Sequence, residues 1–175
     1  DSRKSRGLGD VYKRQGRDFL KCCGHDQKWQ GMSEVFEKLK AYNQKKLGES
    51  GIETLVTSCA ECFRTFALEY ELDDMKVMHT TEFLVEKGFD MGLKTNDEVT
   101  VTYHDPCRLG RQMNIYDEPR DLVGSVEGVS LVEMEHTGED ALCCGVSSMM
   151  SCNENSRALT VSYTHLTLPT KRGVG

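Results

Sequence analysis

The chain has 175 residues and a formal net charge of −6, from 28 Asp and Glu against 22 Lys and Arg. An acidic surface repels phosphate backbones and anionic lipid headgroups, and no apolar run approaches the roughly 20 residues that span a bilayer, so we expect neither a nucleic-acid partner nor direct membrane insertion. Eight cysteines in a chain rich in Glu, Lys and Met do not resemble a small secreted disulfide scaffold and favour a reducing cytoplasm with metal-bound thiolates.

Both ends of the chain can be encoded by one DNA string read in opposite directions. Codons for residues 10–15 give a string whose reverse complement encodes residues 161–165 and permits Leu166. The string resembles the transposase end sequence used to prepare sequencing libraries. We therefore expect residues 1–15 and 160–175 to be adapter-derived, and residues 16–159 to be one truncated domain. Within residues 16–159, the 22 basic and 28 acidic residues of the whole chain become 15 and 26, a net charge of −11.

The spacing of apolar residues predicts helices that alternate with short strands. In chain order, we expect a helix over 33–48, a strand over 52–57, a helix over 58–69, a strand over 76–78, a helix over 81–87, a strand over 98–103, a helix over 117–123 and a strand over 129–134. Ser33 and Ser58 are the expected N-caps of the first two helices. Strands separated by helices are typical of a Rossmann-like α/β fold with mostly parallel strands.

The first two of these helices have clear apolar faces. Their expected inward residues are Val35, Phe36, Leu39 and Tyr42 in the first helix and Phe63, Phe66, Ala67 and Tyr70 in the second. Residues at these spacings share one side of a helix, so we expect them to pack in a core.

Seven of the eight cysteines follow two equal spacings. Cys22-Cys23-Gly24 precedes Cys59-x-x-Cys62 with 35 residues between Cys23 and Cys59, and 35 residues also separate Cys107 from Cys143-Cys144-Gly145. Equal gaps indicate a duplicated unit that contains Cys, Cys-Cys-Gly and Cys-x-x-Cys in that order, with partial repeats over about 16–95 and 96–159. The first copy then lacks its opening cysteine, and the second lacks its closing pair. We therefore expect the isolated chain to bind iron weakly and to be inactive by itself.

The position of these cysteines suits thiolate chemistry. Cys59 and Cys62 fall at a predicted strand-to-helix turn, where the helix dipole and free N–H groups stabilise thiolates. Taken alone, the pair is also typical of structural zinc or of a thioredoxin-like dithiol. The side chains of adjacent Cys22 and Cys23 tend to diverge, which suits separate irons of a cluster better than one tetrahedral ion. A vicinal disulfide is strained and does not explain the repeated gaps.

Four motifs occur in order along the chain: Leu20-Lys21-Cys22-Cys23-Gly24, Val56-Thr57-Ser58-Cys59-x-x-Cys62, Tyr103-His104-Asp105-Pro106-Cys107-Arg108-Leu109-Gly110-Arg111 and Ala141-Leu142-Cys143-Cys144-Gly145. They resemble the cysteine-rich CCG domain of heterodisulfide reductase B and D subunits, of glycolate oxidase and lactate-utilisation iron-sulfur subunits, and of the C subunit of anaerobic glycerol-3-phosphate dehydrogenase. In that family, each complete five-cysteine motif can hold an unusual, noncubane 4Fe-4S cluster.

The resemblance implies one cluster site formed by Cys22, Cys23, Cys59 and Cys62 and a second site formed by Cys107, Cys143 and Cys144. It also implies an iron-sulfur electron-transfer subunit of a cytoplasmic oxidoreductase. Such a subunit relays electrons between a flavoprotein partner and a quinone, thiol, disulfide or carrier acceptor, and meets the inner face of a membrane only through a partner. The chain has no nucleotide-binding glycine fingerprint, so flavin or NAD is expected elsewhere.

Two alternatives stay open at this point. The first is a heterodisulfide reductase that acts directly on a disulfide at the cluster. The second is a structural zinc-binding interaction module, because a four-coordinate ion tolerates an incomplete ligand set better than a five-cysteine cluster does. Iron with sulfide would favour a cluster, and zinc without sulfide would favour the module.

Four further residues have less specific interpretations. His104 can tune a cluster or carry a proton, but a histidine at a strand end more often satisfies loop hydrogen bonds. Arg108 and Arg111 can offset an anionic cluster, contact a partner or be solvated. Cys152 fits neither repeat and is expected to be a small buried or half-exposed side chain and not a ligand.

Overall fold

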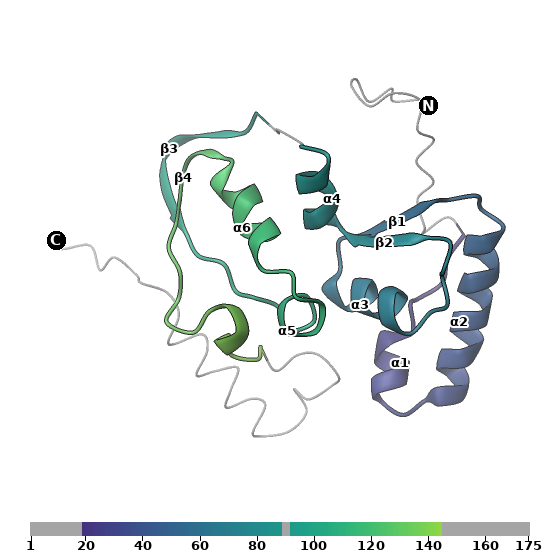
Figure 1. Cartoon of the computed structure of the whole chain (residues 1–175). Coiled ribbons are helices and arrows are strands. Elements are labelled where there is room, and N and C mark those ends of the chain that lie inside the picture. Colours follow the sequence, from purple (N-terminus) through teal and green to yellow (C-terminus); the bar gives the residue numbers. More distant parts are fainter. Residues whose placement is uncertain (1–18, 89–91, 145–175) are drawn as a thin grey trace.

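The computed structural model describes residues 19–88 and 92–144 (Figure 1). The two expected adapter segments, residues 1–15 and 160–175, lie outside these ranges, as do Gly145 and Cys152. The described part contains a pair of N-terminal helices followed by two βαβ units. None of its helices is long and apolar enough to cross a membrane.

The N-terminal pair consists of α1 (His25–Trp29) and α2 (Ser33–Gly48). The helix expected from Ser33 is confirmed, but the N-cap position belongs to Met32, whose carbonyl accepts the N–H groups of Val35 and Phe36. Phe36 is buried, whereas the side chain of Val35 is 39 % exposed and does not join the expected apolar face.

The first βαβ unit runs through β1 (Thr54–Thr57), α3 (Ala60–Leu68) and β2 (Lys76–His79). The two strands are parallel, with Leu55 opposite Val77. The N-cap of α3 is Cys59 and not Ser58, because the Thr57 hydroxyl accepts the Cys59 N–H at 3.3 Å and holds that residue extended. Helix α4 (Thr80–Glu86) follows β2 and is capped by the side chain of His79.

The second unit also has two parallel strands joined through helices, but with two helices between the strands instead of one. It runs through β3 (Lys94–Val101), α5 (Gly110–Met113), α6 (Asp117–Gly124), β4 (Glu127–Leu131) and the short 3-10 helix η2 (Gly138–Asp140). Strands β3 and β4 are parallel. They begin at Lys94 and Glu127, before the starts at residues 98 and 129 that the alternation of apolar residues predicts. Their early pairing is irregular between Lys94 and Val99, and Gly128 has a φ of 83°, so this part of the ladder lacks an alternating pattern.

Parallel strands joined through helices confirm the α/β class. In the described part, the four strands form two separate two-stranded sheets, β1-β2 and β3-β4, and not one continuous sheet. Figure 1 shows the first unit beside α1 and α2, and the second unit on the other side of α3 and α4. Helices α4 and α6 contact each other and join the two units.

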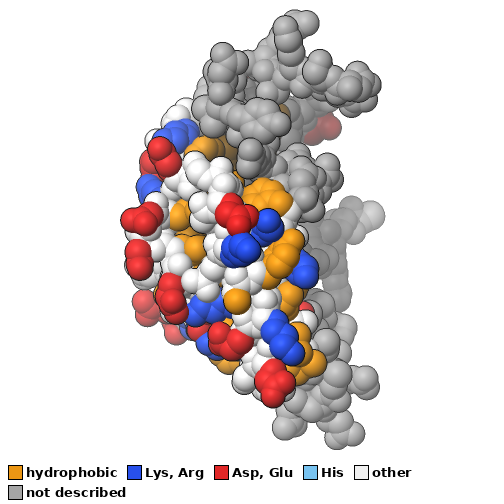
Figure 2. Space-filling model, turned by 90° about the vertical axis from the view of Figure 1, so that its right-hand side faces the viewer, with side chains coloured by type: hydrophobic (Ala, Val, Ile, Leu, Met, Phe, Trp, Pro, Cys, Tyr) orange, Lys and Arg blue, Asp and Glu red, His pale blue; other side chains and the backbone are white. Residues whose placement is uncertain are grey.

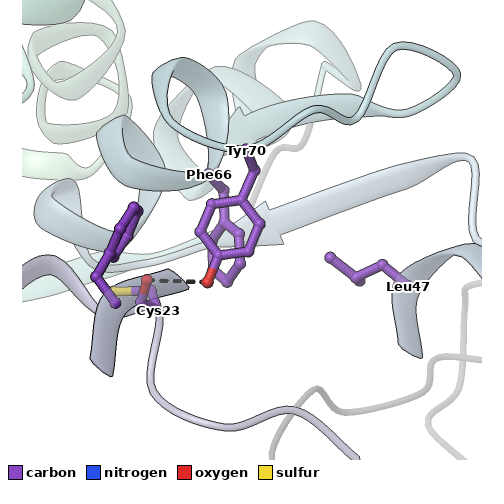
Figure 3. Close-up of a cluster of buried hydrophobic side chains, with 5 residues drawn as sticks. Cys23, Leu47, Phe66 and Tyr70 are labelled. Carbon is purple, nitrogen blue, oxygen red and sulfur yellow. Dashed lines mark hydrogen bonds between the residues drawn. The ribbon is translucent and has the colours of Figure 1, made fainter. Parts of the chain in front are cut away.

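Helix α3 contributes to two hydrophobic clusters. Phe66 lies in the first cluster, whose buried members are Cys23, Phe36, Leu47, Phe66 and Tyr70 (Figure 3). Phe63 lies in the second cluster, with Leu109 and Ile115 of the second unit. The helix that begins at the Cys-x-x-Cys motif is therefore packed against both halves of the molecule, which fixes its position.

Candidate metal centre

Four cysteine thiols from two distant segments meet beside the start of α3. Cys22 and Cys23 immediately precede Gly24 and α1, Cys59 is the N-cap of α3, and Cys62 lies in its first turn. The Sγ atoms of Cys23 and Cys62 are 3.2 Å apart. The thiol of Cys22 interacts with that of Cys23, and the thiol of Cys59 with that of Cys62. The structure thus brings together the four residues that the first repeat predicts.

The contact between Cys23 and Cys62 separates the proton affinities of the two thiols. The Cys62 thiol donates a hydrogen bond to Cys23, which outweighs burial and lowers the pKa of Cys23 to about 7, with help from the backbone N–H of His25. The same contact, together with burial, raises the pKa of Cys62 far above its ordinary value. The pair therefore loses its first proton from Cys23 more readily than an ordinary thiol does, whereas Cys62 keeps its proton, and metal binding would displace the protons that remain.

The distances suit thiolates that share a metal centre. The seven cysteines in the described ranges form no disulfide, and 3.2 Å is well beyond the roughly 2.05 Å of an S–S bond. Thiolates bound at about 2.3 Å to one tetrahedral ion lie about 3.8 Å apart, so a small movement would suffice. The four thiols form a row of pairwise contacts, Cys22 to Cys23 to Cys62 to Cys59, and no three of these sulfur atoms lie within 4.8 Å of one another. Sulfur donors of this kind suit iron-sulfur or zinc ligation once the outer two, Cys22 and Cys59, which are exposed, move inward.

Gly24 allows the Cys-Cys segment to pass close to α2. Its φ is 83°, in the left-handed region that residues with a Cβ rarely adopt. A Cβ at this position would also lie 2.7 Å from a ring carbon of Phe36. The glycine of the Cys-Cys-Gly motif is therefore required both for the turn and for the packing that buries Cys23.

A group of nitrogen and oxygen donors lies next to the four thiols. Suitable atoms of His25, Asp26 and Glu61 lie within 4.8 Å of one another. The His25 Nδ1 atom is 3.3 Å from the Thr65 hydroxyl, and its Nε2 atom is 3.7 Å from Glu61. Burial lowers the pKa of His25, and positive charge on Arg108 and Arg64 lowers it further. Glu61 and Asp26 act in the opposite direction and raise the pKa, with Glu61 the largest influence after burial.

The second cysteine group is assembled from two loops. Cys107 lies between β3 and α5, and Cys143 and Cys144 follow η2. Burial and the neighbouring Cys143 raise the pKa of the Cys107 thiol, and Cys144 acts in the same direction; Arg108 and Arg111 oppose them. The three thiols that the second repeat predicts thus lie close enough to influence one another.

A buried ion pair fixes the loop that carries Cys107. The Asp105 side chain is 2 % exposed and accepts two hydrogen bonds, each 2.8 Å long, from Arg120 in α6. It also accepts the Gly138 N–H at 2.7 Å. Arg120 further contacts Glu133. Burial would raise the pKa of Asp105, but Arg120 and the Gly138 N–H outweigh it and hold the pKa below its usual range.

His104 and Arg111 hold the segment before Cys143. His104 Nε2 lies 2.9 Å from the Leu142 carbonyl oxygen, so the loop-bonding interpretation of this histidine matches the structure. Arg111 donates to the carbonyls of Glu139, at 3.2 Å, and of Ala141. Both side chains therefore act on backbone groups that precede the adjacent cysteines.

Arg108 connects the two cysteine groups. Its guanidinium lies 3.9 Å from the centroid of the Trp29 ring in α1 and donates to Gln112 at 3.0 Å. Arg108 is buried, so the solvated alternative is wrong for this residue. Sequence reasoning did not identify Trp29, Asp105 or Arg120 as site residues, because the partner of each side chain lies far away in the chain. For Asp105, the one signal in the sequence was its position inside the His-Asp-Pro-Cys motif.

Comparison with known proteins finds a family that matches both cysteine groups of the chain. Residues 10–67 and 101–171 match the family model described as "Cysteine-rich domain" (CCG). These ranges run into both chain ends assigned to adapter DNA, so that assignment stays a prediction. No solved structure shows a significant match.

Three curated relatives illustrate the similarity. The chain is 31 % identical over 172 residues to the D subunit of the dihydromethanophenazine:CoB--CoM heterodisulfide reductase of Methanosarcina acetivorans, covering 92 % of this chain and 42 % of the relative. It is 35 % identical over 126 residues to the B subunit of the fumarate reductase (CoM/CoB) of Methanothermobacter marburgensis, covering 71 % and 24 %. It is 29 % identical over 128 residues to the EtfAB:quinone oxidoreductase of Syntrophomonas wolfei, covering 71 % and 18 %.

The chain spans less than half the length of these relatives. The family model, in contrast, matches well over half of the chain and includes all seven cysteines of the two groups. Because of this match, the chain belongs to the cysteine-rich CCG domain family.

Proposed function

We propose that this chain is the cluster-binding part of an iron-sulfur oxidoreductase subunit, in which Cys22, Cys23, Cys59 and Cys62 hold a 4Fe-4S cluster. The observation that carries this proposal is the contact between the Cys-Cys and Cys-x-x-Cys motifs at the start of α3, where the Sγ atoms of Cys23 and Cys62 are 3.2 Å apart and Cys22 and Cys59 each adjoin one of them. Four thiolates are the usual ligand set of such a cluster. Cys107, Cys143 and Cys144 would belong to a second cluster site.

When bound, a cluster supplies one-electron transfer chemistry. The protein's own part is to hold the thiolates and to limit the access of water. The positive end of the α3 dipole favours negative charge at Cys59 and Cys62. Buried Cys23 faces the hydrophobic cluster, whereas Cys22 and Cys59 are exposed, so a partner could approach from their side.

We further propose that the parent protein relays electrons between a flavoprotein partner and a quinone, thiol, disulfide or carrier acceptor in the cytoplasm. The names of the relatives support this range, since they include a heterodisulfide reductase and a quinone oxidoreductase. On the face shown in Figure 2, acidic and basic side chains are interspersed. The described residues on that face form no continuous positively charged patch of the kind that binds nucleic acid.

The test is anaerobic reconstitution of the purified chain with ferrous iron and sulfide, and with zinc in a parallel sample. Iron, sulfide and zinc are then measured, and the reduced sample is examined by electron paramagnetic resonance. We expect iron and sulfide in equal amounts and a paramagnetic signal. Cys59→Ser should lower both contents, whereas Ser58→Ala, a change of the exposed neighbour, should not. Zinc bound without sulfide, in a chain that takes up no iron, would overturn the proposal in favour of a structural module.

A heterodisulfide reductase that acts at the cluster is a second candidate, favoured by the 31 % identity to the D subunit of a heterodisulfide reductase over 92 % of this chain. It requires that the cluster-loaded parent protein reduce a small heterodisulfide with an artificial electron donor. Cys59→Ser and Cys144→Ser should then abolish turnover. Turnover that is unchanged in both variants would reject this candidate and leave the relay function intact.

A further inference from the structure

The backbone of the Cys-Cys segment is bonded to a buried asparagine from another element. Asn43 lies in the middle of α2 and is completely buried. Its Oδ1 atom accepts the Lys21 N–H at 2.8 Å, and its Nδ2 atom donates to the Cys22 carbonyl at 3.0 Å. The Lys21 carbonyl lies 3.3 Å from the same nitrogen. The Asn43 carboxamide thus forms hydrogen bonds with backbone groups of Lys21 and Cys22, more than 20 positions away in the chain.

Tyr70 extends this contact to the second cysteine. Its hydroxyl accepts a hydrogen bond from Asn43 Nδ2 at 3.1 Å and donates to the Cys23 carbonyl at 2.9 Å. Figure 3 shows the tyrosine hydroxyl directed at Cys23. We call Asn43 and Tyr70 together the Asn-Tyr brace. The brace bonds to the backbone carbonyl oxygens of both adjacent cysteines.

The brace meets a physical need of this segment. Residues 20–24 belong to no helix or strand, so their backbone N–H and C=O groups have no regular partners. Buried amide groups without partners are costly, and a carboxamide is one of the few side chains that both donates and accepts. An apolar residue at position 43 could fill the volume but could not satisfy the backbone.

The brace also ties the Cys-Cys segment to the element that carries the facing thiol. Tyr70 follows directly on α3, whose first turn contains Cys62. The Tyr70 ring packs against Phe66, with centroids 4.7 Å apart, and edge-on against Phe36 at 6.3 Å. These aromatic contacts fix the hydroxyl, and the hydroxyl fixes the Cys23 carbonyl. The relative placement of Cys23 and Cys62 therefore depends on the brace.

We propose that Asn43 and Tyr70 are positioning residues that pre-organise Cys22 and Cys23 for cluster binding, a role that rests on the cluster function proposed above. They act through the backbone of the ligating residues. Losing the brace should therefore weaken metal retention and alter the cluster environment more than it alters the fold. Residues that orient metal ligands in this way commonly affect metal affinity by about 10- to 100-fold.

The test compares Tyr70→Phe with a matched control. Tyr70→Phe keeps the ring and removes only the hydroxyl. The control is Gln44→Leu, because Gln44 is next to Asn43 in α2 and donates to the Glu71 carbonyl at 3.1 Å, so it joins the same two elements without contacting the Cys-Cys segment. Each anaerobically reconstituted chain is challenged with an iron chelator, and its paramagnetic signal is recorded. The stability of the metal-free chains is measured by urea unfolding.

We expect Tyr70→Phe to release iron about 10-fold faster than the unmodified chain, with a shifted paramagnetic signal, and Gln44→Leu to retain iron normally. Asn43→Leu should reproduce the effect of Tyr70→Phe, which keeps the inference testable if one variant folds poorly. Unchanged iron release and an unchanged signal in both brace variants would overturn the inference. Equal losses of iron in Tyr70→Phe and in the control Gln44→Leu would overturn it as well. If the unmodified chain itself holds no iron and sulfide, the proposed function fails instead.

Discussion

The two cysteine groups are held in place by different kinds of interaction. The first group is held by neutral hydrogen bonds from Asn43 and Tyr70 inside an aromatic cluster. The second is held by the ion pair between Asp105 and Arg120, extended to Glu133. Neutral buried networks are insensitive to pH and salt, whereas charged networks depend on ionisation. Within one chain, two different kinds of interaction thus hold the loops that carry cysteines.

The two cysteine groups are nevertheless connected by one hydrophobic cluster. Phe63 of α3 packs against Leu109 and Ile115, which flank α5 in the second unit. Helix α3 also carries Cys62 of the first group, while Leu109 is two residues from Cys107 of the second. Damage to this shared cluster should therefore affect both groups, and damage to either network should affect mainly one of them.

The largest expected effect is that of Phe63→Ala. Removing a buried aromatic ring leaves a cavity and should lower the free energy of unfolding by about 4 kcal/mol. Urea unfolding of the metal-free chain measures this. Leu68→Ala in the same helix is the control, because Leu68 is exposed and its loss should cost no more than about 0.5 kcal/mol. Equal costs for the two variants would show that the Phe63 cluster does not join the units.

Arg120→Met should come next, with an effect centred on the second group. It leaves the buried Asp105 carboxylate without its cation, which should cost about 3 kcal/mol. Hydrogen exchange should increase around Asp105 and Gly138 but much less around Cys23. Lys76→Met breaks the exposed ion pair with Glu86, which solvent screens, and should cost much less than Arg120→Met. Uniform exchange throughout the chain would contradict the separation of the two networks.

Acid should weaken the chain through its paired carboxylates. Arg120 lowers the pKa of Glu133 despite burial. At Glu69, burial acts to raise the pKa, but Lys28 and Arg64 outweigh it and lower it. A lowered native pKa gives stability that is complete above the unfolded value of about 4.3 and is lost as pH falls through the native value.

Urea midpoints measured from about pH 6 to about pH 3 should therefore fall at the acidic end. Glu133→Gln should make that fall shallower, because the variant has one fewer carboxylate to protonate. The exposed Glu37→Gln is the control. A fall as steep in Glu133→Gln as in the unmodified chain would exclude this carboxylate as a source of the acid sensitivity.

The smallest expected effect is the direct link between the groups. Arg108 lies over the ring of Trp29, and cation–π contacts of this kind contribute about 1 kcal/mol. A double-mutant cycle with Trp29→Leu and Arg108→Met isolates that coupling energy. The cycle should give about 1 kcal/mol. A coupling energy indistinguishable from zero would mean that the contact between Arg108 and Trp29 does not link the two groups energetically.

Local patterns in the sequence were sufficient to predict the elements that carry the first cysteine group. The helix over Ser33–Gly48 and the strand-to-helix turn at Cys59 follow from periodicity and turn chemistry, and both occur. The Ser58 cap was wrong because a side chain two residues before Cys59, that of Thr57, holds the Cys59 backbone instead. Such a choice between neighbouring caps depends on local geometry that residue preferences do not specify.

Residues that act across the fold could not be predicted in the same way. Asn43 is a polar residue in mid-helix, and nothing in its neighbourhood indicates that it bonds to Lys21 and Cys22. Arg120 likewise meets Asp105 only after the second unit has folded. Cysteine spacing identified which thiols gather, because sulfur chemistry limits the choices. The residues that place those thiols come from many types and have no equivalent signature.

The central claim is that the Cys-Cys and Cys-x-x-Cys motifs of the first group form one cluster site. The most direct measurement is the iron and sulfide content per chain after anaerobic reconstitution of two matched variants, Cys62→Ser and Cys152→Ser. Cys62 is a proposed ligand in contact with Cys23, whereas Cys152 fits neither cysteine repeat. We predict that Cys62→Ser loses the iron and sulfide of the first site and that Cys152→Ser retains both. Equal iron and sulfide in the two variants, at the level of the unmodified chain, would contradict the account.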